Sequence, residues 1–289
     1  MILCEEYIFV THIEINHKWC GYKNMADFNH HETTPSPYVS IVIPAYNCEK
    51  FIETTVASAL QQSFPEFEMI IINDASTDQT PQILRRLQKK DSRIKVFDHK
   101  KNQGVAKTRN EAFGYCKGSF IALLDADDVW HKDKLKEQIE EQKRTGADLI
   151  YCSYAIINEN GNRICDDFIV PRETNLQATL VQSVINCSTA FFKTSLVSRF
   201  RFRSDYYHED LVFWIDLLRA GISVRGVQKV LAAYRVVRGS RAADKFKSAR
   251  NRYLILRRYL KLPVLQSQVI MMQYVARAVN KYKGNVLKK

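Results

Sequence analysis

Short apolar runs alternate with amphipathic segments along the middle of the chain. The apolar runs are rich in β-branched residues and are bounded by polar turn residues, which is typical of buried strands. They lie at residues 38–44, 67–73, 94–97, 119–125 and 148–157. The amphipathic segments between them, predicted as helices, cover residues 49–62, 79–90, 104–116 and 129–145. Strands that alternate with helices of this length predict βαβ units and a parallel sheet.

The pattern weakens after residue 157 and returns later. Residues 158–186 show no clear period. Beyond them a buried run, a helix and a late strand are predicted at residues 187–192, 207–220 and 230–237. Pro263 then separates two amphipathic helices. We therefore expect an α/β domain over residues 37–243 and a basic helical tail over residues 244–289.

The first 36 residues do not share this pattern. Residues 28–36 are polar and histidine-rich and end in turn formers, so residues 1–36 are expected to be a poorly ordered extension, with Met25 an alternative start. Glu5 and Glu6 stand where a signal peptide has its basic segment, and no apolar run approaches the ~20 residues of a membrane-spanning helix. The seven cysteines form no C-x-x-C pair, which favours a reducing, cytoplasmic location over zinc or disulfide chemistry.

Positive charge is concentrated towards the C-terminal end. The whole chain carries a formal charge of +12. Residues 201–289 contain 20 Lys or Arg and 5 Asp or Glu, which leaves the first 200 residues with a net charge of −3. Residues 245–289 contain twelve basic residues and no acidic one. Such an excess suits a polyanionic partner, either anionic lipid or nucleic acid. The alternative is a solvated basic face that packs back on the domain.

Three aspartates follow the apolar run at residues 119–125. Asp125, Asp127 and Asp128 fall within four residues, where the strand leaves the sheet. Ligands of open α/β sheets bind at this carboxyl edge. Clustered carboxylates repel one another, so we expect a hard divalent cation there, with a phosphate-bearing ligand on its other side. The alternative is that one aspartate caps the helix predicted at residues 129–145.

Five short motifs now stand in a fixed order. They lie at residues 39–47, 73–78, 104–110, 125–128 and 208–210. Together they resemble family 2 glycosyltransferases with the GT-A fold, over roughly residues 38–240, and the chain is similar to small bacterial enzymes that build teichuronic acid, O-antigen and capsule. The resemblance implies a Rossmann-like, mostly parallel sheet flanked by helices. It also implies inverting, metal-dependent transfer of one sugar from a nucleotide-sugar, with UDP-sugar as the expected donor, to a glycan or lipid-linked saccharide.

The resemblance assigns the donor-binding roles. The turn after the first strand, which is Pro44, Ala45 and Tyr46, would hold the nucleotide base. Asp74 would hydrogen-bond the uracil. Arg109 would face the nucleotide, since a guanidinium suits a planar base or a phosphate.

The acidic residues receive the roles in catalysis. Asp125 would contact the ribose side, and Asp127 would bind Mn²⁺ or Mg²⁺ on the diphosphate, with Asp128 as support from behind. Asp210 would be the general base that takes the proton of the acceptor hydroxyl, and Glu209 would help to hold the acceptor. The alternative for Glu209 and Asp210 is that they only favour the N-terminus of the following helix.

A few positions carry separate expectations. Ala75 replaces the glycine that is common in the family, which predicts a turn without positive φ. Arg109 has an alternative as a surface helix arginine paired with Glu111 or another acid. Arg238 and Ser240 fall where some relatives close the site over the diphosphate.

Two rival functions remain open at this point. A nucleic-acid-binding protein would interleave basic residues with stacking aromatics along a groove, whereas here the basic residues crowd into the tail, so we expect no nucleic acid as partner. A catalytically inactive nucleotide-binding scaffold would not need its acidic residues.

The Gln-x-x-Arg-Trp motif of processive relatives is missing, so one sugar per reaction is expected. The resemblance also implies lipid-linked acceptors, which would place the enzyme peripherally on the inner face of the cell membrane, where the tail would contact anionic lipid.

Overall fold

The structure is a computed structural model that describes residues 37–237 and 244–283. The extension expected at residues 1–36 and the residues Arg238 and Ser240 lie outside these ranges. The strands are β1 (Val39–Ala45), β2 (Phe67–Asn73), β3 (Ile94–Asp98), β4 (Phe120–Leu123), β5 (Val129–Trp130), β6 (Leu149–Ile157), β7 (Phe191–Lys193) and β8 (Val224–Arg235). The α-helices are α1 (Ile52–Leu60), α2 (Thr80–Lys90), α3 (Val105–Tyr115), α4 (Lys134–Thr145), α5 (Leu176–Val181), α6 (Glu209–Arg219), α7 (Lys245–Leu254) and α8 (Val264–Lys283). Short turns of 3-10 helix, η1 (Cys187–Thr189) and η2 (Thr194–Ser198), flank β7, and a π-helical turn, η4 (Ile255–Tyr259), follows α7.

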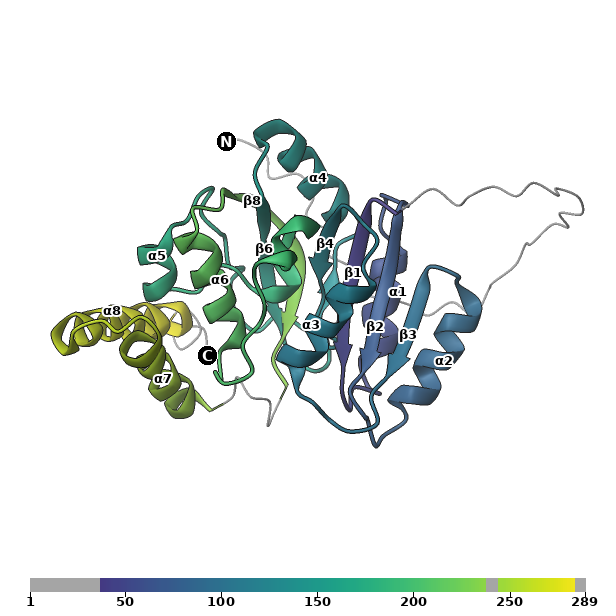
Figure 1. Cartoon of the computed structure of the whole chain (residues 1–289), viewed down its shortest axis with the longest axis horizontal. Coiled ribbons are helices and arrows are strands. Elements are labelled where there is room, and N and C mark those ends of the chain that lie inside the picture. Colours follow the sequence, from purple (N-terminus) through teal and green to yellow (C-terminus); the bar gives the residue numbers. More distant parts are fainter. Residues whose placement is uncertain (1–36, 238–243, 284–289) are drawn as a thin grey trace, which may run out of the picture. The chain divides into compact units, whose positions relative to one another are not determined.

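One mixed sheet forms the centre of the fold (Figure 1). Its strand order is β3-β2-β1-β4-β7-β6-β8-β5. The first four strands in this order are parallel, and β7 runs antiparallel to both β4 and β6. Ala45 at the end of β1 pairs with Asn73 at the end of β2, so these two strands finish at the same level. The predicted α/β class with a mostly parallel sheet is confirmed.

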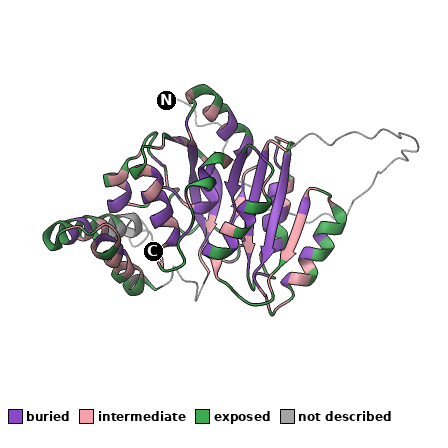
Figure 2. Cartoon of the chain, in the orientation of Figure 1, coloured by how far each residue is buried: buried purple, intermediate pink, exposed green. Residues whose placement is uncertain are grey.

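Helices cover both faces of the sheet, and the alternation of side chains along β1 shows how. Ile41 and Ile43 pack into one apolar cluster with residues of α1, α2 and α4. Val42 points the other way, into a second cluster with residues of α3 and α6. Successive side chains of a strand point to opposite faces, so a fully buried central strand needs apolar residues at every position. This explains the unbroken apolar runs, and the sheet appears buried along nearly its whole width in Figure 2.

The segment after the aspartates differs from the prediction. A helix was expected from residue 129, but Val129 and Trp130 form the short strand β5, which pairs with β8. The helix α4 begins only at Lys134. Val and Trp favour a pleated surface, and Trp130 Nε1 donates a hydrogen bond to the carbonyl oxygen of Ser188 at 2.7 Å. The aspartates therefore lie in a tight turn between two strands and cap no helix.

The tail forms helices that pack on the domain. After the π-helical turn the chain restarts as α8 directly beyond Pro263, as predicted. Side chains of η4 and α8 join an apolar cluster with α5 and α6. Arg252 of α7 is buried there and donates hydrogen bonds to the carbonyl oxygens of Thr179 and Leu180. Among the helices of the described ranges, none is both long and apolar enough to cross a membrane.

Candidate active site

The predicted residues meet at the carboxyl edge of the sheet. Backbone hydrogen bonds fix their level: the N–H of Asp74 donates to the carbonyl oxygen of Ala45 at 2.8 Å, and that of Leu124 donates to Val42 at 3.0 Å. The turns after β1, β2 and β4 are therefore neighbours in space. In a parallel sheet this edge is where ligands bind.

The turn after β1 presents one aromatic ring to solvent. Ala45 is buried and Pro44 is half-buried, whereas Tyr46 is 50% exposed. A ring that the protein leaves half uncovered at this edge can stack on a planar base. The role of all three residues in base binding remains a prediction.

The turns after β1 and β2 are tied to each other, and both use positive φ angles. Asn47 has a φ of 46° and Ala75 a φ of 57°. The N–H of Thr77 donates to Asn47 Oδ1 at 2.8 Å, and the N–H of Asn47 donates to Ser76 Oγ at 3.0 Å. The prediction that Ala75 avoids positive φ is wrong. These cross-links hold Ala75 in a conformation that glycine would adopt more easily.

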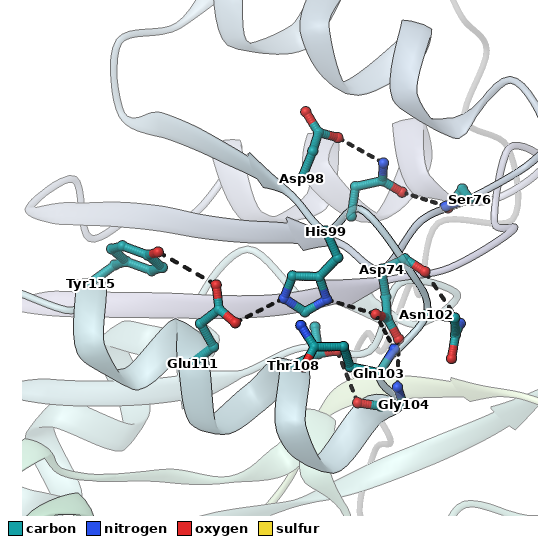
Figure 3. A network of polar contacts seen from close by, with 11 residues as sticks. Asp74, Ser76, Asp98, His99, Asn102, Gln103, Gly104, Thr108, Glu111 and Tyr115 are labelled. Carbon is teal, nitrogen blue, oxygen red and sulfur yellow. Dashed lines mark hydrogen bonds and ion pairs between the residues drawn. The ribbon is translucent and has the colours of Figure 1, made fainter.

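Asp74 is the centre of a hydrogen-bond network shown in Figure 3. Its Oδ1 accepts from the N–H of Gln103, its Oδ2 accepts from that of Gly104, both at 2.8 Å, and His99 Nδ1 lies 2.7 Å from Oδ1. The other ring nitrogen of His99 lies 2.9 Å from Glu111 Oε2. The network joins the end of β2 to the start of α3. It occupies both oxygens of Asp74, and the hydrogen bond to uracil remains a prediction.

The two titratable groups of this network stabilise each other's charge. Burial alone would raise the pKa of Asp74, but the hydrogen bonds from His99, Gln103 and Gly104 outweigh it and lower the pKa. Burial would likewise lower the pKa of His99, but its contacts with Asp74 and Glu111 raise it. A ring nitrogen on each carboxylate favours the imidazolium, which donates at both nitrogens.

Arg109 bridges two acidic residues from distant parts of the chain. Its buried guanidinium donates from Nη2 to Asp125 Oδ1 at 2.6 Å and from Nη1 to Glu209 Oε1 at 3.1 Å. Burial would lower the pKa of Arg109, but Cys187, Asp125 and Glu209 raise it, so the group stays charged. The alternative of a surface arginine paired with Glu111 or another acid is wrong in its position, because Arg109 is buried. Arg109 instead joins the end of β4 to the start of α6.

Asp128 points into the protein. It is fully buried, and its Oδ2 accepts from Ser188 Oγ at 2.5 Å while its Oδ1 accepts from the N–H of Arg235 at 2.8 Å. Ser188 Oγ also accepts from the N–H of Asp125 at 3.0 Å. Burial, together with the charges of Asp127 and Asp125, raises the pKa of Asp128. Asp128 therefore holds the turn in shape and does not face the edge of the sheet.

Asp127 differs from its neighbour. Within residues 37–237 and 244–283, its carboxylate makes no hydrogen bond or ion pair with another side chain. Its carbonyl oxygen accepts from Arg235 Nε at 2.7 Å, which fixes the backbone. Burial and the negative charge of Asp125 raise the pKa of Asp127 to about 6, although Arg235 lowers it in part. The raised pKa shows that burial and the neighbouring Asp125 outweigh the positive charge of Arg235 at this carboxylate.

The free carboxylate oxygens of Asp127 and Asp125 are suitable ligands for a hard divalent cation. Asp127 offers unpaired carboxylate oxygens, and Asp125 has one oxygen that Arg109 does not use. No group of three or more His, Cys, Asp or Glu with metal-binding geometry occurs in the described part of the chain. Mg²⁺ is usually held by one or two carboxylates, substrate phosphates and waters, so two aspartates suffice for a metal that arrives with a diphosphate.

Glu209 and Asp210 are adjacent, but their surroundings differ. Both lie in the first turn of α6. Glu209 is buried and bound to Arg109. Asp210 is half-buried, and its Oδ1 accepts the hydrogen bond of the N–H of Leu211 at 2.8 Å. The first of the pair thus supports the structure, and the second keeps carboxylate surface open to solvent.

The buried thiol of Cys187 shows that the acidic residues surround one region. Burial raises the pKa of Cys187, Arg109 lowers it, and Asp125, Asp210 and Glu209 raise it further. Because Coulomb interactions weaken with distance, these charged groups lie near the thiol. The end of β4, the start of α6 and the turn η1 therefore line the same site.

Some residues of the site were missed in the sequence. Ser188 and Arg235 hold the aspartate turn, and Tyr234 of β8 lies beside it. Burial, followed by the charges of Asp128, Asp127 and Asp125, raises the pKa of Tyr234. A serine inside the apolar run at residues 187–192 was the only signal for Ser188, and the strand β8 was predicted six residues too short at its start.

Comparison with known proteins identifies the family. The sequence profile described as "Glycosyl transferase family 2" matches residues 40–198, which is more than half of the chain and includes the turns after β1, β2 and β4. The chain belongs to glycosyltransferase family 2. The predicted family and the predicted enzyme class, a glycosyltransferase, are confirmed.

Curated relatives of this family match most of the chain. TuaG of Bacillus subtilis, a glycosyltransferase assigned provisionally to teichuronic acid biosynthesis, is 34% identical over 86% of this chain and 99% of its own length. WfgD and WfaP of Escherichia coli are both named UDP-Glc:α-D-GlcNAc-diphosphoundecaprenol β-1,3-glucosyltransferase. WfgD is 30% identical over 84% of this chain and 94% of its own length. WfaP is 39% identical over 72% of this chain and 81% of its own length.

Two solved structures confirm the GT-A fold. S. aureus TarS in complex with UDP-GlcNAc superimposes with a TM-score of 0.64 at 22% identity, over 86% of this chain and 75% of that one. The mannosyltransferase PcManGT from Pyrobaculum calidifontis, in complex with GDP-Man and Mn²⁺, has a TM-score of 0.62 at 17% identity, over 84% of this chain and 74% of that one. At these identities the likeness concerns the fold.

Proposed function

We propose that this glycosyltransferase moves one sugar from a UDP-sugar to a hydroxyl of a lipid-linked saccharide in bacterial surface polysaccharide synthesis, with inversion and with Mn²⁺ or Mg²⁺ as cofactor. One observation carries the proposal. In each of the acidic pairs Asp127-Asp128 and Glu209-Asp210, one carboxylate is bound inside the protein and the other is left open at the site. The open residues are Asp127 and Asp210, which are the two that need to meet a ligand.

The relatives support the choice of substrates. WfgD and WfaP are named for a UDP-Glc donor and a diphosphoundecaprenol-linked acceptor. The structural neighbour TarS binds UDP-GlcNAc, while PcManGT binds GDP-Man and Mn²⁺. A UDP-sugar and a lipid-linked saccharide are therefore the donor and the acceptor to test first.

The donor half of the site follows from the strand ends. Tyr46 would lie against the base, and the turn held by Asp74 would close the pocket on the other side. Asp127 would hold the metal. Asp125, kept in place by Arg109, would contact the ribose side, and its remaining oxygen would be available to the metal. When bound, the metal ion supplies a Lewis acid that neutralises the charge on the departing nucleoside diphosphate.

The acceptor half depends on Asp210. Its carboxylate would accept the proton of the acceptor hydroxyl while that oxygen forms the bond to the anomeric carbon and the bond to the diphosphate breaks. A single carboxylate is enough, because the leaving group needs no proton. This differs from glycoside hydrolysis, in which one carboxyl group is the general acid and a second is the base or nucleophile. Arg109, through Glu209, fixes the start of α6 and thereby the position of Asp210.

The exchange Asp210→Asn tests this assignment, with Glu209→Gln as the matched comparison. Removing a general base typically lowers a rate by roughly 10²- to 10⁴-fold, so Asp210→Asn should transfer sugar more slowly by that factor and still bind UDP with Mn²⁺. Glu209→Gln should lower the melting temperature, because it breaks the buried pair with Arg109. Transfer is measured by UDP release and UDP binding by calorimetry. Equal loss of binding and transfer in Asp210→Asn would refute the role of base.

A further inference from the structure

In the part of the chain that the structure describes, the tail has two apolar faces, of which the domain covers one. On the inner face, Ile255 and Ile270 are buried in the cluster that contains Leu211 and Ile215 of α6. On the outer face, α7 and α8 line a groove together. This outer face, defined by Phe246, Arg250, Tyr253, Leu265, Val269 and Met272, combines residues at helical spacing from both helices. Figure 2 shows the outward sides of α7 and α8 as largely exposed.

The exposed fractions at the outer face are unusually high for apolar side chains. Phe246 is 83% exposed, Leu265 77% and Met272 67%. Each of these exceeds every other large apolar side chain in the described part of the chain. Single exposed apolar residues are common, but a contiguous group on two helices marks an interaction surface.

Positive charges predominate around this face. Residues 245–289 contain twelve basic residues and no acidic one. In the described part, Arg250 lies in the groove, and Lys247, Arg258 and Lys261 are exposed on the same segment. The preceding Asp244 is used locally, since its Oδ1 accepts from the N–H of Lys247 at 2.8 Å. An apolar face bordered by basic side chains complements a surface that offers acyl chains and anionic headgroups.

The tail is also connected to the acceptor side of the site. His208 Nε2 lies 3.1 Å from the carbonyl oxygen and from Oγ of Ser248 in α7. Asp210, the proposed base, is two residues further along and lies in the first turn of α6, the helix on which the tail packs. A contact made by the outer face would thus set the position of the acceptor side relative to the surface that it touches.

We propose that the outer face of α7 and α8 docks on an anionic lipid surface, with Phe246, Leu265 and Met272 inserted at the boundary between headgroups and acyl chains. Arg250 and the neighbouring cations would bind the lipid phosphates. The inference rests on the proposed function in one respect, because a lipid-linked acceptor lies in the same membrane. The docking itself does not depend on which sugar is transferred.

Co-sedimentation of the full chain with vesicles tests the docking. Wild-type protein should bind vesicles of phosphatidylcholine and phosphatidylglycerol, and bind pure phosphatidylcholine vesicles much less. The double exchange Leu265→Glu and Met272→Glu should weaken binding by about tenfold or more, since it removes inserted apolar groups and adds charges of the wrong sign. Ile169→Glu is the matched control, because Ile169 is 54% exposed on the main domain and should leave binding unchanged. Arg250→Gln should weaken binding to the anionic vesicles and flatten its dependence on salt.

Two further measurements separate this inference from the proposed function. The melting-temperature shift with UDP and Mn²⁺ should be the same in the double variant as in wild type, because both exchanges lie on α8, which carries none of the predicted donor-binding residues. If vesicle binding follows the pattern above but no nucleotide binds, the docking stands and the proposed function fails. Vesicle binding that is unchanged in the double variant, or equal for neutral and anionic vesicles, would overturn the docking. A wild-type dimer in light scattering that the double variant converts to a monomer would overturn it too, since a second copy of the chain would then cover the face.

Discussion

Asp127 and Asp74 are both aspartates at the ends of strands, yet their surroundings move their pKa values in opposite directions. Asp74 accepts hydrogen bonds from two backbone N–H groups and from His99, which lower its pKa. Asp127 lies beside Asp125 with no side-chain donor, and its pKa is raised to about 6. The ionised Asp74 therefore stabilises the nucleotide-free protein. The ionised Asp127 destabilises it, and this favours the binding of a cation beside its carboxylate.

This difference predicts that Asp127→Asn stabilises the nucleotide-free protein. The pKa of Asp127 is higher in the folded state than its ordinary value of 3.8, so ionisation of this residue costs stability above about pH 6. Asparagine avoids that cost. The melting temperature at pH 8 should rise by roughly 2–4 °C, the effect of about 1 kcal/mol in a domain of this size. The gain should shrink as the pH falls through 6 towards 3.8.

The order of the melting temperatures of wild type and Asp127→Asn should reverse when UDP and Mn²⁺ are added. With UDP and Mn²⁺ present, wild-type protein should gain stability and Asp127→Asn should not, because the variant lacks the carboxylate that would hold the metal. Scanning calorimetry at pH 5 and pH 8, with and without ligand, gives the four melting temperatures that are needed for each protein. A lower melting temperature for the ligand-free variant at pH 8 would mean that Asp127 is a structural residue.

At the residue scale, the sequence predicted which acidic residues lie near the site. It did not predict which of them are bound within the protein and which are left open. The acidic pairs were visible because they follow apolar runs or precede an amphipathic segment. Which member of each pair is bound within the protein depends on partners far away in the chain. Ser188 lies 60 residues from Asp128, and Arg109 lies 100 residues from Glu209. No local pattern records such distances.

At the scale of elements, His99 links β3 to the turn after β2 and to α3. Its ring lies between the carboxylates of Asp74 and Glu111. The pKa of His99 is raised above 6.5, so its contribution to stability is complete below about pH 6.5 and is lost as the pH rises through the folded value. The pKa of Asp74 is lowered below 3.8, so its contribution is complete above about pH 3.8. The network is therefore strongest between these two values.

His99→Gln tests this network. The variant should melt below wild type by several degrees at pH 6, because the charged hydrogen bonds to two carboxylates are lost. The difference should become smaller as the pH is raised towards 9. His131→Gln is a control at a half-buried histidine outside the network. A difference between His99→Gln and wild type that does not change with pH would contradict a protonated His99.

Helices and strands were predicted correctly where the local sequence pattern and the tertiary contacts favour the same structure. The buried parallel strands were predicted well, because β1 and β2 need apolar residues on both faces. The failure came after the aspartates, where Val129 and Trp130 were included in a helix. There the pairing of Val129 with Ala233 of β8, a contact between distant segments, decides the structure. The six-residue α5 was missed, since it spans too few residues to show a period.

At the scale of the molecule, the charge asymmetry separates the site from the tail. The part before residue 201 has a net charge of −3 and contains every predicted donor-binding residue. The basic tail packs on α5 and α6 through one face and exposes the other. The two alternatives that the sequence left open for the tail, packing on the domain and contact with lipid, are therefore compatible. They concern opposite faces of the same helices.

The central claim is that the carboxyl edge of the sheet binds a nucleoside diphosphate together with a metal held by Asp127. The most direct test is a thermal-shift series on the full chain with UDP, GDP, dTDP, CDP and ATP, each with and without Mn²⁺. A ligand at 100 times its dissociation constant stabilises the folded state by about 2.7 kcal/mol. We predict a shift with UDP that requires Mn²⁺ and that is absent in Asp127→Ala. No shift with any of these nucleotides, or the same shift in Asp127→Ala, would contradict the claim.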